Sequence, residues 1–307
     1  MKHFINLSDV SIEEFEQLLK LGLELKSKQK KGIPHRLLEG KTLGMIFSKS
    51  STRTRVSFEV GMYQLGGTSL FLSQNDIQLG RGESIYDTAN VLSRYLDGIM
   101  IRTFNQEDVE DLARFGSIPV INGLTDSMHP CQIMADLLTV YENKGSLKGL
   151  KLAYVGDGNN IVNSLLQGCA KTGINISVAS PKGYWCLPDI AEKAQDDAAK
   201  MGSKICMTED PEKAVHDADV VVTDTWVSMG QETEKESRIK TFMPYQVNDK
   251  LFAHAKQDAI FLHCLPAYRG YEVTDSVIDG PRSLIFDEAE NRLHAQKAIL
   301  VTLLGGL

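Results

Sequence analysis

The chain has no long apolar run and no excess of basic residues, and each absence narrows the possible class of protein. Among its 307 residues, 33 are Lys or Arg and 40 are Asp or Glu, giving a formal net charge of −7. An acidic balance favours neither nucleic acid nor a membrane surface as a partner. No stretch approaches the roughly eighteen apolar residues of a membrane span, and Met1 to Val10 lack the basic start of a signal peptide. We therefore expect a cytoplasmic protein.

Paired cysteine spacing is also missing. The five cysteines stand at positions 131, 169, 186, 206 and 264. An odd number without the spacing of metal ligands argues against both a disulfide framework and a zinc site. Internal repeats and low-complexity segments are absent as well, while the hydrophobic fraction of 42% is that of a globular protein.

Strand-like apolar runs alternate with helical patterns along the whole chain, which predicts an α/β fold of two domains, each with a parallel sheet. We expect the first domain over 1–135 and the second over 150–287, with a last helix at 288–307 that packs back on the first. An opening helix should begin after Ser8 or Ser11, and another should run from Pro130 through Tyr141. The expected strands are Leu43–Phe47, Thr68–Leu72, Gly98–Ile101, Pro119–Asn122, Leu152–Val155, Ile174–Ala179, Lys204–Met207, Val220–Thr223 and Ile260–Leu262.

Residues Ser51 to Arg55, Ser-Thr-Arg-Thr-Arg, follow the first expected strand and should form the first turn of a helix, which continues with Val56, Val60 and Tyr63. The first N–H groups of a helix have no partner within the helix, and the helix dipole favours negative charge there. Hydroxyl groups and the planar guanidinium groups of Arg53 and Arg55 add further donors. The segment predicts a site for a phosphate or carboxylate, although a capped helix with surface arginines is the simpler alternative.

A glycine-rich turn, Val155-Gly156-Asp157-Gly158-Asn159-Asn160, follows the first strand of the second domain. It resembles a dinucleotide-binding turn, but Ile161 stands at the position of the third glycine. The next strand also ends without an acidic residue that could bind the ribose. The turn instead places the amides of Asn159 and Asn160 at the end of the sheet, where α/β proteins bind small polar ligands. One of the two would be explained by helix capping alone.

Further polar clusters fall at expected strand-to-helix junctions, where loops meet a rigid sheet. Each has a structural explanation by itself, as a helix cap, a core cysteine or a surface charge. The clusters are Arg102, Ser127-Met128-His129-Pro130-Cys131-Gln132, Asp224-Thr225-Trp226-Val227-Ser228-Met229-Gly230 and Phe261-Leu262-His263-Cys264-Leu265-Pro266.

Together with Ser51–Arg55, these clusters resemble the aspartate and ornithine carbamoyltransferase family over nearly the full length of the chain. Ser-Thr-Arg-Thr-Arg and His-Pro-Cys-Gln match the pattern that marks carbamoyl phosphate throughout the family. Asp224 with Ser228-Met229-Gly230 looks like the ornithine branch, as does His263-Cys264-Leu265-Pro266, where an aspartate enzyme would carry a His-Pro-Leu-Pro-Arg type of sequence. Glu290-Asn291-Arg292 in the last helix also matches.

The resemblance implies a set of residues for carbamoyl phosphate. Arg102 and His129 would reach the carbonyl oxygen, where negative charge grows as an amine attacks. Gln132 and the backbone carbonyl of Cys264 or Leu265 would accept hydrogen bonds from the NH2 group. The full set is Ser51, Thr52, Arg53, Thr54, Gln78, Arg102, His129, Pro130, Cys131, Gln132, Cys264, Leu265 and Arg292.

The same resemblance implies that Asn160, Asp224, Ser228 and Met229 bind the amino acid ornithine. Cys264 and Asp224, with Arg102 and His129, would be the catalytic residues, because a carboxylate and a thiol can orient the amine and accept its proton. His263 and Glu272 would tune the thiol.

The implied activity is transfer of the carbamoyl group to the side-chain amine of L-ornithine, giving L-citrulline and phosphate, with no metal and no organic cofactor. The loop around Gln78 would reach a neighbouring subunit, which implies a homotrimer or an assembly of trimers. Putrescine or an acylated ornithine stays open as the acceptor. A dehydrogenase and a non-catalytic anion-binding module are the alternatives from other classes.

Overall fold

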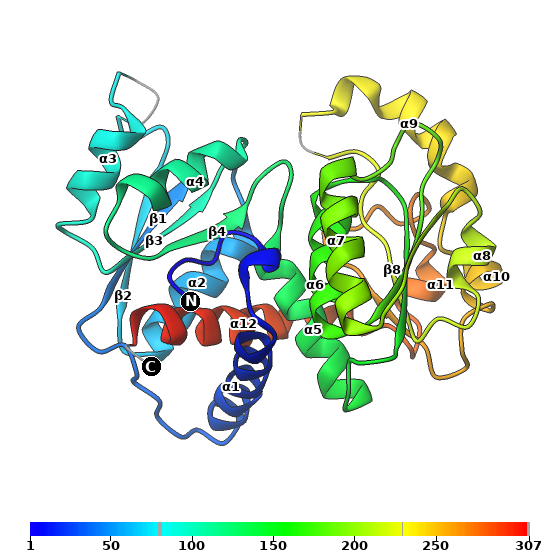
Figure 1. The fold of residues 1–307 in the computed structure, drawn as a ribbon, viewed down its shortest axis with the longest axis horizontal. Helices are drawn as coiled ribbons and strands as arrows, with labels where there is room; N and C mark the ends of the chain where they lie inside the picture. Colours follow the sequence, from blue (N-terminus) through cyan, green and yellow to red (C-terminus); the bar gives the residue numbers. More distant parts are fainter. Residues whose placement is uncertain (79–81, 229, 306–307) are drawn as a thin grey trace. The chain divides into compact units, whose positions relative to one another are not determined.

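In the computed structural model of the protein, residues 1–78, 82–228 and 230–305 are described. They form two compact units, one of Met1–Leu138 with Glu290–Leu307 and the other of Thr139–Ala289. Each unit contains one parallel sheet flanked by helices (Figure 1). The α/β class with two parallel-sheet layers is therefore confirmed.

The first unit is built on a four-stranded sheet in the order β2-β1-β3-β4, formed by β1 (Thr42–Phe47), β2 (Thr68–Ser73), β3 (Gly98–Arg102) and β4 (Val120–Leu124). Helices α3 (Ile85–Leu92) and α4 (Gln106–Phe115) cover one face of this sheet. Their apolar residues Ala89, Val109 and Leu112 pack with Ile99 and Ile101 of β3 in one buried cluster. The loops that carry the candidate site of this unit follow the C-terminal ends of its parallel strands.

The other helices of this unit are α1 (Ile12–Lys30), α2 (Thr52–Gln64), the first part of α5 (Pro130–Lys144) and most of α12 (Ile285–Leu304), preceded by the short η1 (Leu7–Asp9). Ser11 caps α1 in a reciprocal arrangement with Glu14, which decides between the two expected caps. A side chain at Gly61 of α2 would meet Lys297 and Leu293 of α12, so these two helices pack closely. Figure 1 shows α12 in red beside α2.

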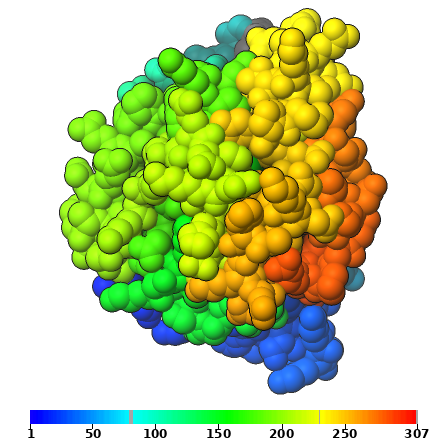
Figure 2. Space-filling model, turned by 90° about the vertical axis from the view of Figure 1, so that its right-hand side faces the viewer, coloured from blue at the N-terminus to red at the C-terminus, as the bar shows by residue number. Residues whose placement is uncertain are grey.

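The second unit has a five-stranded sheet in the order β7-β6-β5-β8-β9, formed by β5 (Lys151–Val155), β6 (Asn175–Ala179), β7 (Ile205–Thr208), β8 (Val220–Val222) and β9 (Ile260–Leu262). Helices α6 (Asn160–Thr172) and α7 (Pro188–Met201) lie together on one face. Among its described residues, the unit also has six short helices, which are α8 (Pro211–Val215), α9 (Lys235–Phe242), α10 (Asp249–Phe252), α11 (Asp275–Ile278), η2 (Glu232–Glu234) and η3 (Met243–Tyr245). Of these, α8, η3, α10 and α11 share one apolar cluster with the sheet, and Figure 2 shows their outer surface in yellow-green to orange.

All nine expected strands are present, most of them with ends shifted by one or two residues. The last helix begins at Ile285, three residues before the expected start, because Ile285 and Phe286 already belong to its first turn. The α2 helix is present, but Val56, Val60 and Tyr63 lie on its exposed side while Phe58 and Met62 are buried. Within the described ranges, no helix is both long and apolar enough to cross a membrane.

Candidate active site

The segment predicted to bind an anion lies where β1 ends and α2 begins. Ser51 is the N-cap residue of α2, and its hydroxyl oxygen accepts from the backbone N–H of Thr54 at 3.2 Å. Thr52, Arg53 and Thr54 form the first turn of the helix, with Thr54 fully buried and the other two exposed. The predicted helix start is thus confirmed, and it presents backbone N–H groups, hydroxyls and a guanidinium group in one place.

Arg55 does not contribute its guanidinium group to this place. Its Nε lies 2.9 Å from Glu59 Oε1 one turn along the helix, and its guanidinium carbon lies 3.8 Å from the centre of the Phe71 ring. Both contacts hold the side chain on the exposed side of α2. In this arrangement only Arg53 offers its guanidinium group to the helix start, and a role for Arg55 in anion binding stays a prediction.

His129 lies directly before α5 and is only 5% exposed. Burial, together with the positive charges of Arg292, Arg102 and Arg53, holds the pKa of its imidazole well below the usual 6.5. His129 is therefore neutral, with one ring nitrogen that can donate and one that can accept. The charges that act on it come from α12, β3 and α2, so the fold gathers three guanidinium groups around one neutral imidazole.

Arg292 connects α12 to two other candidate residues. Its Nη2 donates to Thr54 Oγ1 at 2.9 Å, and its Nη1 donates to Gln132 Oε1. Gln132 in turn donates from Nε2 to Asp136 Oδ1 at 2.8 Å. Residues 54, 132 and 292, which are far apart in sequence, therefore form one buried polar network.

Pro130 and Cys131 open α5, beside the residues just described. Cys131 is fully buried, and its sulfur donates to the backbone carbonyl of Asn122 at 3.3 Å. Burial raises the pKa of its thiol to about 12, so a thiolate is not available at neutral pH. A contact between Cys131 and a ligand would come from its backbone.

Two positions complete this part of the protein. Gln78 is exposed in the loop between β2 and α3, directly before Leu79–Arg81, which lie outside the described residues. Lys49 was not among the predicted residues, yet it is 8% exposed, pairs with Asp126 and lies 4.4 Å from the centre of the Phe104 ring. The Lys49–Asp126 ion pair connects the loop before Ser51 to the loop before His129. The signal in the sequence that could have identified Lys49 is its place two residues before the hydroxyl cluster.

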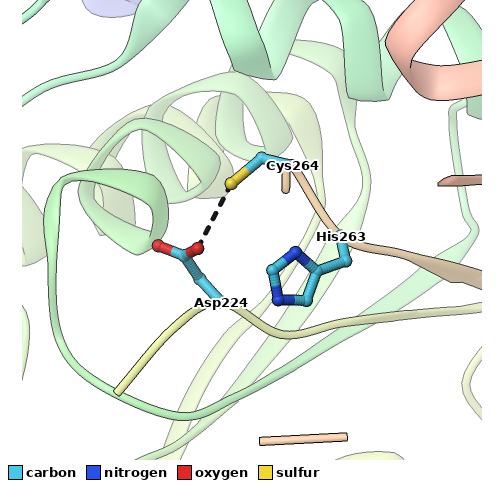
Figure 3. Close-up of side chains that lie close together, drawn as sticks. All are labelled: Asp224, His263 and Cys264. Atoms are coloured by element: carbon cyan, nitrogen blue, oxygen red, sulfur yellow. Dashed lines mark hydrogen bonds between the residues drawn. The ribbon is translucent and has the colours of Figure 1, made fainter. Parts of the chain in front are cut away.

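In the second unit, Asp224 and Cys264 lie at the ends of the neighbouring strands β8 and β9 (Figure 3). The sulfur of Cys264 donates to Asp224 Oδ1 at 3.2 Å, and Asn159 Nδ2 donates to Asp224 Oδ2 at 2.7 Å. Asn159 also caps α6 by accepting from Ile161 N at 3.0 Å. The structure thus brings the carboxylate and the thiol, two of the expected catalytic side chains, into direct contact.

His263 and Glu272, expected near the thiol, are both fully buried and in contact. The His263 Nε2 lies 3.2 Å from Glu272 Oε1, while Nδ1 accepts from the Leu265 N–H at 2.9 Å. Because Nδ1 must accept there, the proton is on Nε2 and points to Glu272. Leu265 has a φ of +57°, which turns the chain so that its N–H meets the ring. The backbone N–H of His263 donates to Glu288 Oε2 at 2.8 Å, which fixes the start of the segment.

Asp224, His263 and Cys264 each offer one ligand atom, and the three atoms lie within 4.8 Å of one another. Such a set could attract a soft metal ion. Both nitrogens of the His263 ring are already bound, however, by Leu265 and Glu272. A metal ion would have to break one of these buried contacts, so the set is arranged for hydrogen bonding.

Two of the three other residues expected to bind the acceptor lie within the described ranges. Asn160 is the first residue of α6, beside Asn159. The backbone N–H of Ser228 donates to Gln231 Oε1 at 3.0 Å, in the loop after β8, and Met229 lies outside the described residues.

A buried ion pair fixes both ends of the Ser228 loop. Arg238 in α9 pairs with Asp157 in the loop after β5, and its Nε donates to the backbone carbonyl of Trp226 at 2.6 Å. Its guanidinium group also lies 5.0 Å from the centre of the Tyr184 ring. Arg238 therefore joins the segment just before Ser228 to the glycine-rich turn, and sequence reasoning missed both partners because a single Arg or Asp carries no pattern.

The glycine-rich turn is covered by the chain itself. Gly158 N donates to Tyr184 O at 2.9 Å, and a Cβ at Gly158 would lie 2.2 Å from the backbone carbon of Trp185. The loop that carries residues 184 and 185 thus occupies the place where a pyrophosphate would approach the turn. This agrees with the sequence argument against a dinucleotide.

Comparison with known proteins gives one consistent family. The model of the carbamoyl-P binding domain of aspartate/ornithine carbamoyltransferases matches residues 2–142, and that of their Asp/Orn binding domain matches residues 148–303. Ornithine carbamoyltransferases from Caldicellulosiruptor saccharolyticus and Carboxydothermus hydrogenoformans are each 60% identical to the chain, covering 98% and 99% of it and 98% of their own lengths. A solved ornithine carbamoyltransferase from Pyrococcus furiosus has a TM-score of 0.97 and 54% identity, covering 100% of this chain and 98% of its own.

Proposed function

Because the chain belongs to the aspartate/ornithine carbamoyltransferase family, we propose that it transfers the carbamoyl group of carbamoyl phosphate to the side-chain amine of L-ornithine, giving L-citrulline and phosphate. The observation that carries the acceptor is the Asp224–Cys264 pair, held by Asn159. The carboxylate of Asp224 suits a cationic amine. Ser228, which was also expected to bind ornithine, follows two residues after Trp226 in the loop after β8. The relatives named above, whose names state the same activity, support this acceptor.

Carbamoyl phosphate is assigned to the first unit. The N-terminal turn of α2, with Ser51, Thr52, Arg53 and Thr54, suits the dianionic phosphate, and Arg292 supports Thr54 from α12. This assignment is supported by the match of residues 2–142 to a carbamoyl-P binding domain.

The carbonyl group is the reacting centre. As the amine attacks the carbonyl carbon, charge builds on the oxygen, and a donor there typically contributes a few kcal/mol. Arg102 provides a fixed positive charge, and a neutral His129 provides an N–H without adding a further charge among the guanidinium groups. Gln132, with a backbone carbonyl of Cys264 or Leu265, is assigned to the carbamoyl NH2 group.

The ornithine side chain carries an ammonium group that must lose a proton before it can attack. Asp224 is assigned to hold this ammonium and to accept its proton, and Cys264 in its thiolate form is assigned as the second acceptor. The attacking nitrogen then gives up a second proton as the carbonyl re-forms and the C–O bond to phosphate breaks, and the departing phosphate takes up that proton. Asn160, Ser228 and Met229 are assigned to the α-amino and α-carboxylate groups of ornithine.

We also propose a homotrimer or an assembly of trimers. The exposed side of α2 carries Val56, Val60 and Tyr63, of which Tyr63 is 80% exposed, and the edge strand β2 exposes Leu70 and Phe71. Apolar side chains gathered on a helix and an adjacent sheet edge are typical of a surface that another subunit covers. Light scattering of the purified protein should give three times 34.0 kDa or a multiple of that mass. A cytoplasmic location stays a prediction from the sequence.

The activity is tested by an acceptor profile. The purified protein is incubated with carbamoyl phosphate and either ornithine, putrescine or N-acetylornithine, and ureido product is measured. Turnover should require ornithine, since the Ser228 loop is assigned to a carboxylate that putrescine lacks. Product from putrescine or acetylornithine, and none from ornithine, would show that the acceptor is wrong while the donor assignment stands.

A further inference from the structure

The orientation of the Gln132 amide is determined by its two neighbours. An amide presents an oxygen that only accepts hydrogen bonds and a nitrogen that only donates them. Gln132 Nε2 lies 2.8 Å from Asp136 Oδ1, and Gln132 Oε1 faces Arg292 Nη1. An ionised carboxylate can only accept and a guanidinium group can only donate. The two contacts therefore allow one orientation, with the amide oxygen on the side of Arg292.

This orientation decides which chemical group the amide oxygen can bind. Arg292 also donates to Thr54 Oγ1 at 2.9 Å, so the oxygen of Gln132 lies on the side of the network that leads to the start of α2. An amide oxygen has a second lone pair, which can accept from the NH2 of a carbamoyl group. A reversed amide would instead set one NH2 group against another.

We propose that Asp136 is a positioning residue that holds the Gln132 oxygen toward the donor substrate and so makes the protein select a carbamoyl group over an acyl group of the same shape. The proposal rests on the proposed function, because it assumes that Gln132 meets the carbamoyl NH2. Gln132 and Asp136 are one turn apart on α5, and each is 2% exposed. Water is thus largely kept from a mismatched pair, and an unpaired polar group there is costly.

The Asp136→Asn variant removes the acceptor-only character of this side chain. Asparagine has nearly the same size, but it can offer Gln132 either an oxygen or an NH2 group, so position 136 no longer selects the orientation and Arg292 alone favours the amide oxygen on its side. Asp136→Ser, with a side chain too short to reach Nε2, removes the same contact in a smaller residue. Asp97→Asn is the matched control, because Asp97 directly precedes β3, at the opposite end of that strand from Arg102, and accepts from Lys41 Nζ at 3.0 Å.

Two stable phosphonates provide the test. Phosphonoacetamide has an NH2 group where acetonylphosphonate has a methyl group, and neither can react. Calorimetric titration should show that both Asp136 variants bind phosphonoacetamide roughly tenfold more weakly, the value of one lost hydrogen bond. Binding of acetonylphosphonate should stay within about twofold, and the control should bind both compounds like the unmodified protein.

A double variant separates positioning from support of the fold. In a Gln132→Met background, adding Asp136→Asn should change the ratio of the two affinities by less than about twofold, because the amide is already absent. Equal losses for both phosphonates, unchanged binding of both, or an additive effect in the double variant would each overturn the proposal. If the unmodified protein fails to bind phosphonoacetamide at all, the donor assignment itself is wrong, which is a different result.

Discussion

Lys297 in α12 is a buried amine whose partners carry no opposite charge. Its side chain is 0% exposed, and Nζ lies 3.2 Å from His35 Nε2 and 3.0 Å from Gln64 Oε1. The Nδ1 of His35 lies 2.9 Å from the carbonyl of Ile33, so Nδ1 donates and Nε2 accepts from the lysine. Burial lowers the pKa of Lys297 from 10.5 to about 8. We predict that, because of this residue, the free energy of unfolding of the protein rises as the pH increases from neutral to alkaline.

The sign follows from the lowered pKa. The folded protein disfavours the ammonium form, so the penalty is complete below about pH 8 and disappears as the pH rises toward 10.5, the value for the unfolded chain. The difference between the two pKa values corresponds to about 3 kcal/mol. Most of this penalty is present at pH 7 and most of it is gone at pH 10, a gain in stability of about 2 kcal/mol.

Lys297→Met removes the titrating group and keeps most of the side-chain volume. Urea unfolding of the original protein and the variant is measured from pH 7 to pH 10 at one protein concentration, because subunit assembly would make stability depend on concentration. The free energy of unfolding of the original protein should rise by about 2 kcal/mol relative to the variant over this range. The unpaired His35 and Gln64 lower the stability of the variant by a similar amount at each pH, so the difference between pH values isolates Lys297.

Lys20→Met is the control, since Lys20 lies on α1 with a side chain 67% exposed. Its unfolding curve should follow that of the original protein within about 0.5 kcal/mol at every pH. Parallel curves for Lys297→Met and the original protein would refute the reasoning, because they would mean that the buried amine keeps an ordinary pKa. A relative gain for the variant at high pH would mean that the sign is reversed.

Three further variants test the second unit. Cys264→Ser should lower turnover at least about a hundredfold while phosphonoacetamide binding stays within about threefold, since a hydroxyl is a poorer proton acceptor than a thiolate. Arg238→Met should lower the free energy of unfolding by about 3–5 kcal/mol, because it leaves Asp157 as a buried charge without its partner; adding Asp157→Asn should recover part of this loss. Gly158→Ala should shift the fluorescence of Trp185, because the added Cβ would lie 2.2 Å from the backbone of that residue.

Each of these outcomes can fail in a specific way. Full turnover in the serine variant would remove the thiol from proton transfer. A loss of under about 1 kcal/mol in the free energy of unfolding of Arg238→Met would mean that Asp157 is protonated rather than paired at neutral pH. Burial raises the pKa of Asp157 to about 6. The measurement is therefore repeated at about pH 5 and pH 8, on either side of that value. An alanine at 158 without spectral or stability change would mean that the covering loop is not held by Gly158.

Strands and helix starts were predictable because they depend on neighbours in sequence. Ser51 caps α2 and Ser11 caps α1 through bonds to residues three positions ahead, and such short-range chemistry is visible in the sequence itself. Parallel pairing also follows from alternating strands and helices, and it sends the polar residues after β1, β3, β8 and β9 to the same ends of their sheets.

Side-chain partners that are distant in sequence were not predictable in the same way. Arg55 has the same chemistry as Arg53, and only the positions of Glu59 and Phe71 show that it faces away from the helix start. Asn159 and Asn160 are identical residues side by side, yet the backbone at the cap sends Asn159 to Asp224. In each pair the two residues have the same chemistry, and their positions on the backbone decide which contacts each side chain makes. Site residues therefore need contacts as well as motifs, as the Gln132 amide shows: its type allows two orientations, and Asp136 and Arg292 leave one.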